Sequence, residues 1–185
     1  MRPTTKALIT LISGFYLACL LISGLEEQLY LNRFLVFNSH EYWRLLTVAL
    51  THGGIMHLFF NMYALLILGN SIESALGRNK FLLIFLISQI GASLTSIYFS
   101  AFNTVSVGAS GAIFGLFGAM AVLSKKFGFE DKSIYVIIGI NFAIGFILPG
   151  IDWRAHLGGL ISGALVSLFL LSPDRKSTRL NSSHV

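Results

Sequence analysis

Six apolar segments, separated by short turns that carry most of the charged residues, dominate this sequence of 185 residues. A transmembrane helix needs about 20 consecutive apolar residues, and the first three segments are long enough. The fourth and sixth are shorter, so we expect their helices to begin below the membrane surface, which is tolerated where the lead-in is buried in protein or lines a wet cavity. The pattern predicts an all-α polytopic membrane protein, with residues 1–173 forming one six-transmembrane-helix bundle. The predicted spans are residues 7–25, 48–72, 81–101, 109–124, 133–149 and 155–172.

The composition excludes most soluble classes of protein. Of all residues, 55% are hydrophobic and only 11% are charged, whereas an average soluble domain is about 25% charged. Too few polar residues remain to coat a soluble core of this size. A soluble globular enzyme, a disordered protein and a nucleic-acid-binding protein are therefore excluded, and the expected surroundings are the lipid bilayer.

The positive charges indicate how the spans are oriented. With six spans both termini lie on one side, and that side carries ten of the 13 Lys and Arg residues. The other side carries Arg33, Arg44 and Arg154. Because cytoplasmic loops are enriched in Lys and Arg, we expect both termini in the cytoplasm. No small-residue cleavage site precedes Glu26, so we expect the first span to be retained rather than removed as a signal peptide.

Three features outside the span pattern need an interpretation. Residues 26–47 are rich in aromatic and aliphatic side chains but too charged to span. This favours an amphipathic structure in the outer interface, and an ordinary apolar loop packed on the bundle is the alternative. Residues 174–185 form a polar tail whose last ten residues resemble translated vector sequence, so we leave the tail out of the fold. The lone Cys19 excludes a disulfide framework and a cysteine metal site.

Strongly polar residues inside spans are costly, so each one is a candidate for function. His57 and Asn61 are four residues apart in the second span. On a helix they share one face and can donate hydrogen bonds to a single small group. His52 lies about 140° away around the same helix, given about 100° per residue, and is less suited to reach that group.

Ser110 and His156 open the fourth and sixth spans. Ser110 lies in the run Gly108-Ala109-Ser110-Gly111, where the glycines permit a tight backbone and close approach. Taken alone, Ser110 is most simply a helix N-cap. The same position is surrounded by unpaired backbone N–H groups and by the positive end of the helix dipole.

Small residues predict how Ser110 and His156 come together. Gly159 and Gly163 follow His156 at helical spacing, and Gly111 begins a similar stripe after Ser110. Such spacing lets two transmembrane helices pack backbone to backbone. Both spans begin on the outer side in this topology, so packing through these faces places Ser110 and His156 side by side near the outer surface.

These features together indicate nucleophilic acyl transfer. His156 supplies the base that a serine hydroxyl needs. The Ser110 N–H, the His57 ring and the Asn61 amide are available as donors to a tetrahedral oxyanion. An ionised third member would be costly to bury, so we predict a Ser–His dyad, with Asp152, four residues before His156, as a minor candidate for a triad.

Two other classes of function would use the same histidines. A transporter or proton channel would relay protons through His52, His57 and His156, but it would favour acidic partners at membrane depth, and the predicted spans contain none. A haem or metal protein would leave Ser110 and Asn61 unexplained. We therefore expect no cofactor and no metal.

Five motifs, in order along the chain, point to one family. They are Trp43-Arg44 in the first outer segment, H-x4-H-x3-N at His52, His57 and Asn61, the pair Glu73 and Gly77, G-x-S-G at 108–111, and A-H-x-x-G-x-x-x-G at 155–163. With these motifs the chain resembles the rhomboid intramembrane serine proteases, in their six-span bacterial form, over about residues 5–172.

The resemblance implies a serine endopeptidase in a bacterial plasma membrane, with an active site that opens outward. Its substrates would be single-span proteins, cut in or near the outer ends of their transmembrane helices, at small residues close to helix-destabilising ones. Ser110 would be the nucleophile and His156 the base. The Ser110 backbone, His57 and Asn61 would form the oxyanion site.

The resemblance also implies roles for supporting residues. Gly108 would belong to a strand-like approach to the serine, and His52 would be a neighbouring structural residue. Arg44, next to Trp43, would pin the first outer segment. Glu73 would bond to backbone near the inner ends of the helices.

Three phenylalanines complete the interpretation. Phe114 stands where many relatives carry Tyr, so its ring would still stack on His156 while a hydroxyl contact would be lost. The fifth span, with Phe142 and Phe146, is our candidate for a movable side wall.

The alternative within the family is an inactive relative that binds membrane proteins. Such a relative would be expected to lack the serine or the histidine, and this chain keeps both.

Overall fold

The computed structural model describes residues 1–128, 132–147 and 150–172, so the polar tail of residues 174–185 lies outside the described residues. The long helices are α1 (Pro3–Leu21), α5 (Ile55–Leu76), α6 (Arg78–Phe99), α7 (Ser110–Phe127), α8 (Ser133–Ile147) and α9 (Trp153–Leu171). The short elements are α2 (Leu25–Leu29), β1 (Leu31–Asn32), α3 (Arg33–Asn38), α4 (Arg44–Thr47), the 3-10 turn η1 (Val48–Leu50) and β2 (Val105–Ser106).

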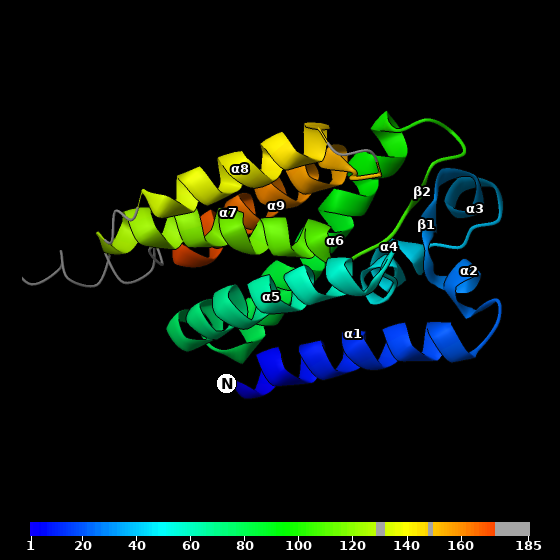
Figure 1. Cartoon of the computed structure of the whole chain (residues 1–185). Coiled ribbons are helices and arrows are strands. Elements are labelled where there is room, and N and C mark those ends of the chain that lie inside the picture. The colour runs from blue at the N-terminus through cyan, green and yellow to red at the C-terminus, as the bar shows by residue number, and fades with distance from the viewer. Residues whose placement is uncertain (129–131, 148–149, 173–185) are drawn as a thin grey trace, which may run out of the picture.

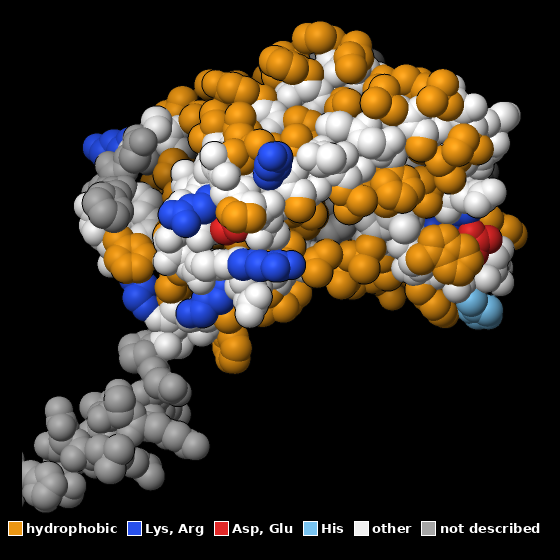
Figure 2. All heavy atoms as spheres, turned by 90° about the horizontal axis from the view of Figure 1, so that it is seen from below, with side chains coloured by type: hydrophobic (Ala, Val, Ile, Leu, Met, Phe, Trp, Pro, Cys, Tyr) orange, Lys and Arg blue, Asp and Glu red, His pale blue; other side chains and the backbone are white. Residues whose placement is uncertain are grey.

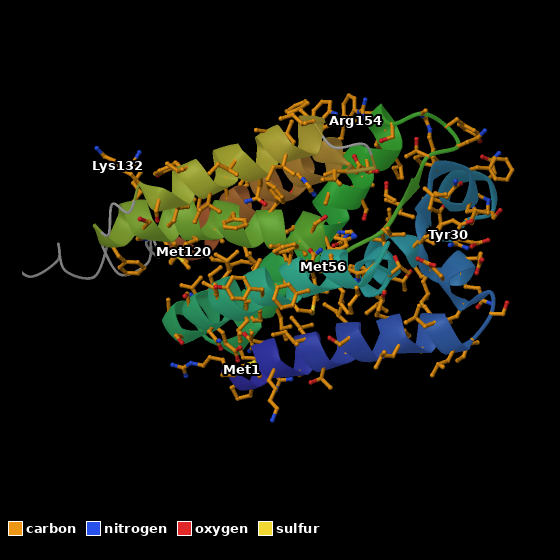
Figure 3. All side chains as sticks on the ribbon, in the orientation of Figure 1. Met1, Tyr30, Met56, Met120, Lys132 and Arg154 are labelled. Atoms are coloured by element: carbon orange, nitrogen blue, oxygen red, sulfur yellow. The ribbon has the colours of Figure 1, made fainter. Side chains whose placement is uncertain are left out.

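The long helices run back and forth along one common direction, and the short elements gather at one end of the bundle (Figure 1). Figure 3 shows Met1 and Lys132 at one end and Tyr30 and Arg154 at the other. Hydrophobic side chains cover much of the surface in Figure 2, whereas Lys and Arg gather toward one end. Apolar surface of this extent suits lipid rather than water, so the chain is an integral membrane protein with several apolar helices.

The predicted apolar segments coincide with the long helices, which confirms an all-α protein. Helices α1, α5, α6 and α9 are each long and apolar enough to cross a membrane, and α8 is a shorter apolar helix of 15 residues. Helix α9 begins two residues before the sixth predicted span and is long enough to cross a membrane, so the expectation that this span is too short was wrong. The Asp152 side chain accepts a hydrogen bond from the Ala155 N–H and thereby starts α9 at Trp153.

The second segment begins its helix later than predicted. Residues 48–50 form the turn η1, and α5 starts only at Ile55, after an irregular stretch. Val48 and Ala49 are buried. Their apolar character therefore reflects packing inside the protein and not a membrane-spanning helix. His52 therefore precedes α5, and the predicted angle of about 140° between His52 and His57 around one helix was wrong.

Helices α7 and α9 pack backbone to backbone through their glycines. A Cβ atom on Gly159 would lie 2.0 Å from the carbonyl oxygen of Gly111, and one on Gly163 would lie 2.0 Å from that of Gly115. A Cβ on Gly111 would lie 2.4 Å from the Cβ of Ala92 on α6. The predicted small-residue packing is confirmed, and it brings the first turns of α7 and α9 together.

Glu73 joins α5 to the start of α1. Its buried carboxylate accepts hydrogen bonds from the backbone N–H groups of Thr4 (3.1 Å) and Thr5 (2.8 Å) and from the Thr5 hydroxyl (2.8 Å). The first N–H groups of a helix have no partner inside it, and the helix dipole favours a negative charge there. The expectation that Glu73 bonds to backbone near one end of the bundle is confirmed.

Arg44 holds residues 26–47 together. Its Nη1 donates to the carbonyl oxygens of Glu27 and Tyr30, each at 2.8 Å, and its Nε donates to Glu41 Oε2 at 2.6 Å. The exposed Trp43 donates from its indole N–H to the carbonyl of Gln28 at 3.3 Å. Arg44 therefore pins this segment, as the resemblance implied.

The segment of residues 26–47 has two faces. One face is buried: Leu31 and Val36 cluster with Val48 and with Ile97 of α6. The other face exposes large hydrophobic side chains, Phe34, Phe37, Tyr42, Trp43 and Leu46. The segment is thus amphipathic, as the sequence predicted, and it is also packed on the bundle.

We expect Gly159→Ala to lower the free energy of unfolding by about 1–3 kcal/mol, because the new methyl group has to push α9 away from the Gly111 carbonyl. Thermal unfolding of the detergent-solubilised protein measures this. Gly14→Ala on α1 is the matched control, since nothing lies within 4 Å of that position. It should leave the stability unchanged or raise it by up to about 1 kcal/mol. Equal melting temperatures for the two variants would contradict the packing described above.

Candidate active site

Ser110 is the first residue of α7, and its hydroxyl oxygen lies 3.0 Å from Nε2 of His156. The N-cap of α7 is Ala109, with no side-chain capping hydrogen bond. The simplest interpretation of Ser110 alone, a capping serine, was therefore wrong. Because Ser110 opens the helix, its backbone N–H has no acceptor within α7.

The His156 ring is buried and clamped between aromatic rings. It stacks on Phe114 with ring centroids 4.0 Å apart and an interplanar angle of 10°. Phe142 of α8 approaches edge-on, 5.1 Å from the Phe114 ring and 6.5 Å from the His156 ring. The phenylalanine that replaces the tyrosine of many relatives keeps the predicted stacking.

The second ring nitrogen of His156 faces α8. Among the residues that the structure describes, Nδ1 has no hydrogen-bond partner, and a Cβ atom on Gly145 would lie 3.7 Å from it. The Asp152 carboxylate instead accepts from the Ala155 N–H and from the hydroxyls of Ser96 and Ser106. In the described residues Ser110 and His156 thus form a pair, and no hydrogen bond joins Asp152 to the His156 ring.

Gly108 keeps a small volume open beside the serine. Its φ of +117° is rarely adopted by residues with a side chain, and its N–H donates to the Val48 carbonyl at 3.0 Å. A Cβ atom on Gly108 would lie 2.9 Å from Nε2 of His57 and 3.8 Å from the backbone nitrogen of Ser110. Two potential donors therefore border the space that the missing side chain leaves.

Asn61 and His52 both lie against His57. The Asn61 amide donates to the His57 carbonyl at 2.8 Å, and its second amide hydrogen remains to donate elsewhere. The His52 ring packs edge-on against the His57 ring, with centroids 5.1 Å apart, and against Tyr16 at 6.4 Å. The structure thus brings Ser110 and His156 into direct contact and places the His57 ring beside Gly108. Asn61 is attached to the His57 backbone one helical turn later.

Sequence reasoning missed the hydroxyl partners of Asp152. Ser96 lies inside α6 and Ser106 ends β2, so neither stands near Asp152 along the chain. The one usable signal was the position of Asp152 just before an apolar helix, which is typical of an N-cap. Capping α9 accounts for the hydrogen bond to Asp152 Oδ1 and does not predict the partners of Oδ2.

The site has the parts for attack on a carbonyl group. A serine hydroxyl that is hydrogen-bonded to an imidazole can lose its proton as it attacks. Donors that are already in place can hold the negative charge that develops on the carbonyl oxygen. In the described part of the chain, no group of three or more His, Cys, Asp or Glu side chains is placed to hold a metal ion.

Comparison with known proteins agrees with this geometry. The rhomboid domain family matches residues 39–173 of the chain. The chain belongs to the rhomboid family. Rhomboid protease GluP of Bacillus subtilis is 43% identical over 138 residues, which cover 72% of this chain. RHOMBOID-like protein 1 of Arabidopsis thaliana is 40% identical over 159 residues, 81% of this chain. RHOMBOID-like protein 6, mitochondrial, of the same plant is 41% identical over 143 residues, 74% of this chain.

The matched regions are only parts of these relatives. They amount to 27% of the Bacillus protease, 40% of RHOMBOID-like protein 1 and 46% of RHOMBOID-like protein 6. The chain therefore spans less than half the length of each of the three. What it shares with them is the rhomboid domain.

We expect the stacking on Phe114 to shift the ring-proton resonances of His156 to high field. Phe114→Leu should move them downfield, because the aromatic ring 4.0 Å away is removed. NMR of protein with labelled histidines, in detergent micelles, measures this, with His156→Ala to assign the signals. Phe117→Leu is the control, since among the described residues that ring packs edge-on against Phe114 and not against His156. Unmoved His156 signals in Phe114→Leu would contradict the stacked arrangement.

Proposed function

We propose that this rhomboid-family chain is an intramembrane serine endopeptidase. It hydrolyses a peptide bond in or near the outer end of a transmembrane helix of another protein, through a Ser110–His156 dyad and an acyl-enzyme intermediate. The observation that carries the proposal is the 3.0 Å contact between Ser110 Oγ and His156 Nε2, made by two polar side chains inside an apolar helix bundle. Polar groups in such a place are costly and are kept for function.

The first half of the reaction forms the acyl-enzyme. Ser110 Oγ attacks the carbonyl carbon of the substrate while His156 Nε2 takes the hydroxyl proton. The resulting oxyanion accepts hydrogen bonds from the Ser110 N–H, the His57 ring and the Asn61 amide. The carbon–nitrogen bond then breaks, and the leaving amine takes the proton from His156 Nε2.

The second half releases the enzyme. A water molecule gives a proton to His156 Nε2 and attacks the ester carbonyl carbon. The oxyanion forms again in the same site and collapses, so that the bond to Ser110 Oγ breaks. Ser110 recovers its proton from His156, and the new carboxylic acid leaves. The stacking of Phe114 keeps the imidazole in one orientation through both halves.

The surroundings of the dyad support this substrate class. Helix α8 presents exposed apolar side chains to the lipid, among them Val136, Ile140 and Ile144. A single-span helix can lie along such a surface, but its carbonyls are hydrogen-bonded until the helix unwinds. Small and helix-destabilising residues near the cut therefore favour cleavage.

The side wall that admits the substrate is α8. Phe142 contacts the Phe114 ring, which stacks on His156. Phe146 packs on Trp153 at the start of α9, with ring centroids 4.9 Å apart. These two ring contacts are the ones that have to open for a helix to reach Ser110. Water for the second half of the reaction enters by the same opening.

We further propose the six-span topology, with both termini in the cytoplasm of a bacterial plasma membrane and the site open to the outside. The Lys and Arg residues at the starts of α1 and α6 and at the end of α7 belong to the end of the bundle that carries Met1. Figure 2 shows Lys and Arg side chains gathered toward one end. The end with Ser110 has Arg33, Arg44 and Arg154. The positive-inside rule supports this orientation.

Ser110→Ala and His156→Ala should each abolish cleavage of a single-span test substrate in liposomes, while the thermal stability stays nearly unchanged. Ser71→Ala is the matched control: its hydroxyl bonds only within α5, to the Ile67 carbonyl, and its loss should leave the rate unchanged. Residual proteolysis in a clean Ser110→Ala preparation would sink the serine mechanism.

Asn61→Ala should lower kcat by roughly 10- to 1000-fold, as removal of one oxyanion donor does. Asn141→Ala is the control, because Asn141 on α8 makes the same 2.8 Å bond to the carbonyl four residues earlier. If both variants cleave the test substrate at the same rate as the unmodified chain, Asn61 has no part in the oxyanion site.

A further inference from the structure

We infer that Asp152 is a positioning residue whose carboxylate fixes the place of Ser110 relative to His156. The inference rests on the proposed function, because it explains how the proposed dyad is held. Asp152 touches neither reacting atom. It acts through the two chain segments that carry them.

The contacts of the carboxylate join three elements. Oδ1 accepts from the Ala155 N–H at 3.2 Å, in the first turn of α9. Oδ2 accepts from the Ser106 hydroxyl at 2.8 Å, at the end of β2, and from the Ser96 hydroxyl in α6. The two serine oxygens are themselves 3.1 Å apart. One side chain thus links α9, β2 and α6.

Asp152 and Ser106 each lie four residues before one member of the dyad. Asp152 precedes His156 by four residues and accepts the His156 N–H on its own carbonyl at 3.2 Å. Ser106 precedes Ser110 by four residues. The carboxylate therefore ties together the two strands of chain that lead into the nucleophile and the base.

The segment between Ser106 and Ser110 needs such a tie. It contains Gly108 in a left-handed conformation, and glycine leaves the backbone more freedom than other residues do. On one side it is held by the pairing of Ser106 with Leu31 in β1 and by the Gly108–Val48 bond. Those contacts lead to the first outer segment and η1. The Asp152 contact leads to α9 and thus to His156.

An ionised carboxylate suits this position chemically. It only accepts hydrogen bonds and has about four lone-pair sites, so it can serve an N–H and two hydroxyls at once. Its negative charge lies at the start of α9, where the helix dipole is positive. The glycine packing sets how close α7 and α9 run, and Asp152 sets how their first turns face each other.

The first test is a pair of variants with the same shape at Ser106. Ser106→Thr keeps the hydroxyl and Ser106→Val replaces it with a methyl group. We expect Ser106→Thr to retain kcat, and Ser106→Val to lower kcat about 10-fold with KM unchanged, since a misplacement of about 1 Å can cost about 100-fold in rate. A kcat that is equal in the two variants, or a change in KM alone, would overturn the inference.

The second test asks whether Asp152 acts through Ser106. Asp152→Ser can still cap α9 but is too short to reach both hydroxyls. The double variant Asp152→Ser, Ser106→Val should have the same kcat as Asp152→Ser alone. The hydrogen bond between Ser106 and Asp152 is already lost in Asp152→Ser, so the second change removes nothing more. Losses that multiply would show that the two residues act independently and would contradict the inference.

A measurement without substrate separates this inference from the proposed function. In protein with 15N-labelled histidine, the His156 Nε2 resonance reports its hydrogen bond with Ser110. Ser106→Val should move it toward its position in Ser110→Ala, and Ser106→Thr should not. If the unmodified chain cleaves nothing and this shift occurs, the protease proposal fails and the positioning role stands. An unmoved resonance in Ser106→Val overturns the positioning role whether or not the chain is a protease.

Discussion

The close packing of α7 on α9 is the contact on which the rest of the structure depends. Gly159 and Gly163 lie so near the carbonyls of Gly111 and Gly115 that no side chain fits between the helices. In lipid, where burying apolar surface gives little advantage, such close contact is what holds helices together. It also sets the site, because Ser110 opens the first of these helices and the other carries a histidine in its first turn.

Three charged side chains in this bundle bind backbone groups at or near the ends of helices and strands. Glu73 accepts the first N–H groups of α1, and Arg44 donates to the carbonyls that end α2 and precede β1. Asp152 caps α9 and binds two hydroxyls. Unpaired polar groups are costly in an apolar medium, so these pairings are strong constraints on how the elements meet. His156 Nδ1, like both ring nitrogens of His52, is buried without a hydrogen-bond partner in the described residues, and it lies on the side that faces α8.

Sequence patterns predicted the parts of this structure that depend on local spacing. Apolar segments located the long helices, and the glycine spacing predicted which two of them meet at Ser110 and His156. The start of α5 was misplaced because Val48 and Ala49 are apolar for packing and not for spanning. Capping by Asp152 starts α9 two residues before the predicted span. The bonds from Asp152 to Ser96 and Ser106 join residues far apart in the chain. No local pattern encodes contacts of that kind.

The central claim is that His156 activates Ser110 for attack. The most direct measurement treats the purified protein with a fluorophosphonate and maps the adduct by mass spectrometry, alongside Ser110→Ala and His156→Ala. The account predicts one adduct, on Ser110, that is absent from both variants. An adduct that forms on Ser110 at the same rate without the histidine, or one that forms on a different serine and persists in Ser110→Ala, would contradict it.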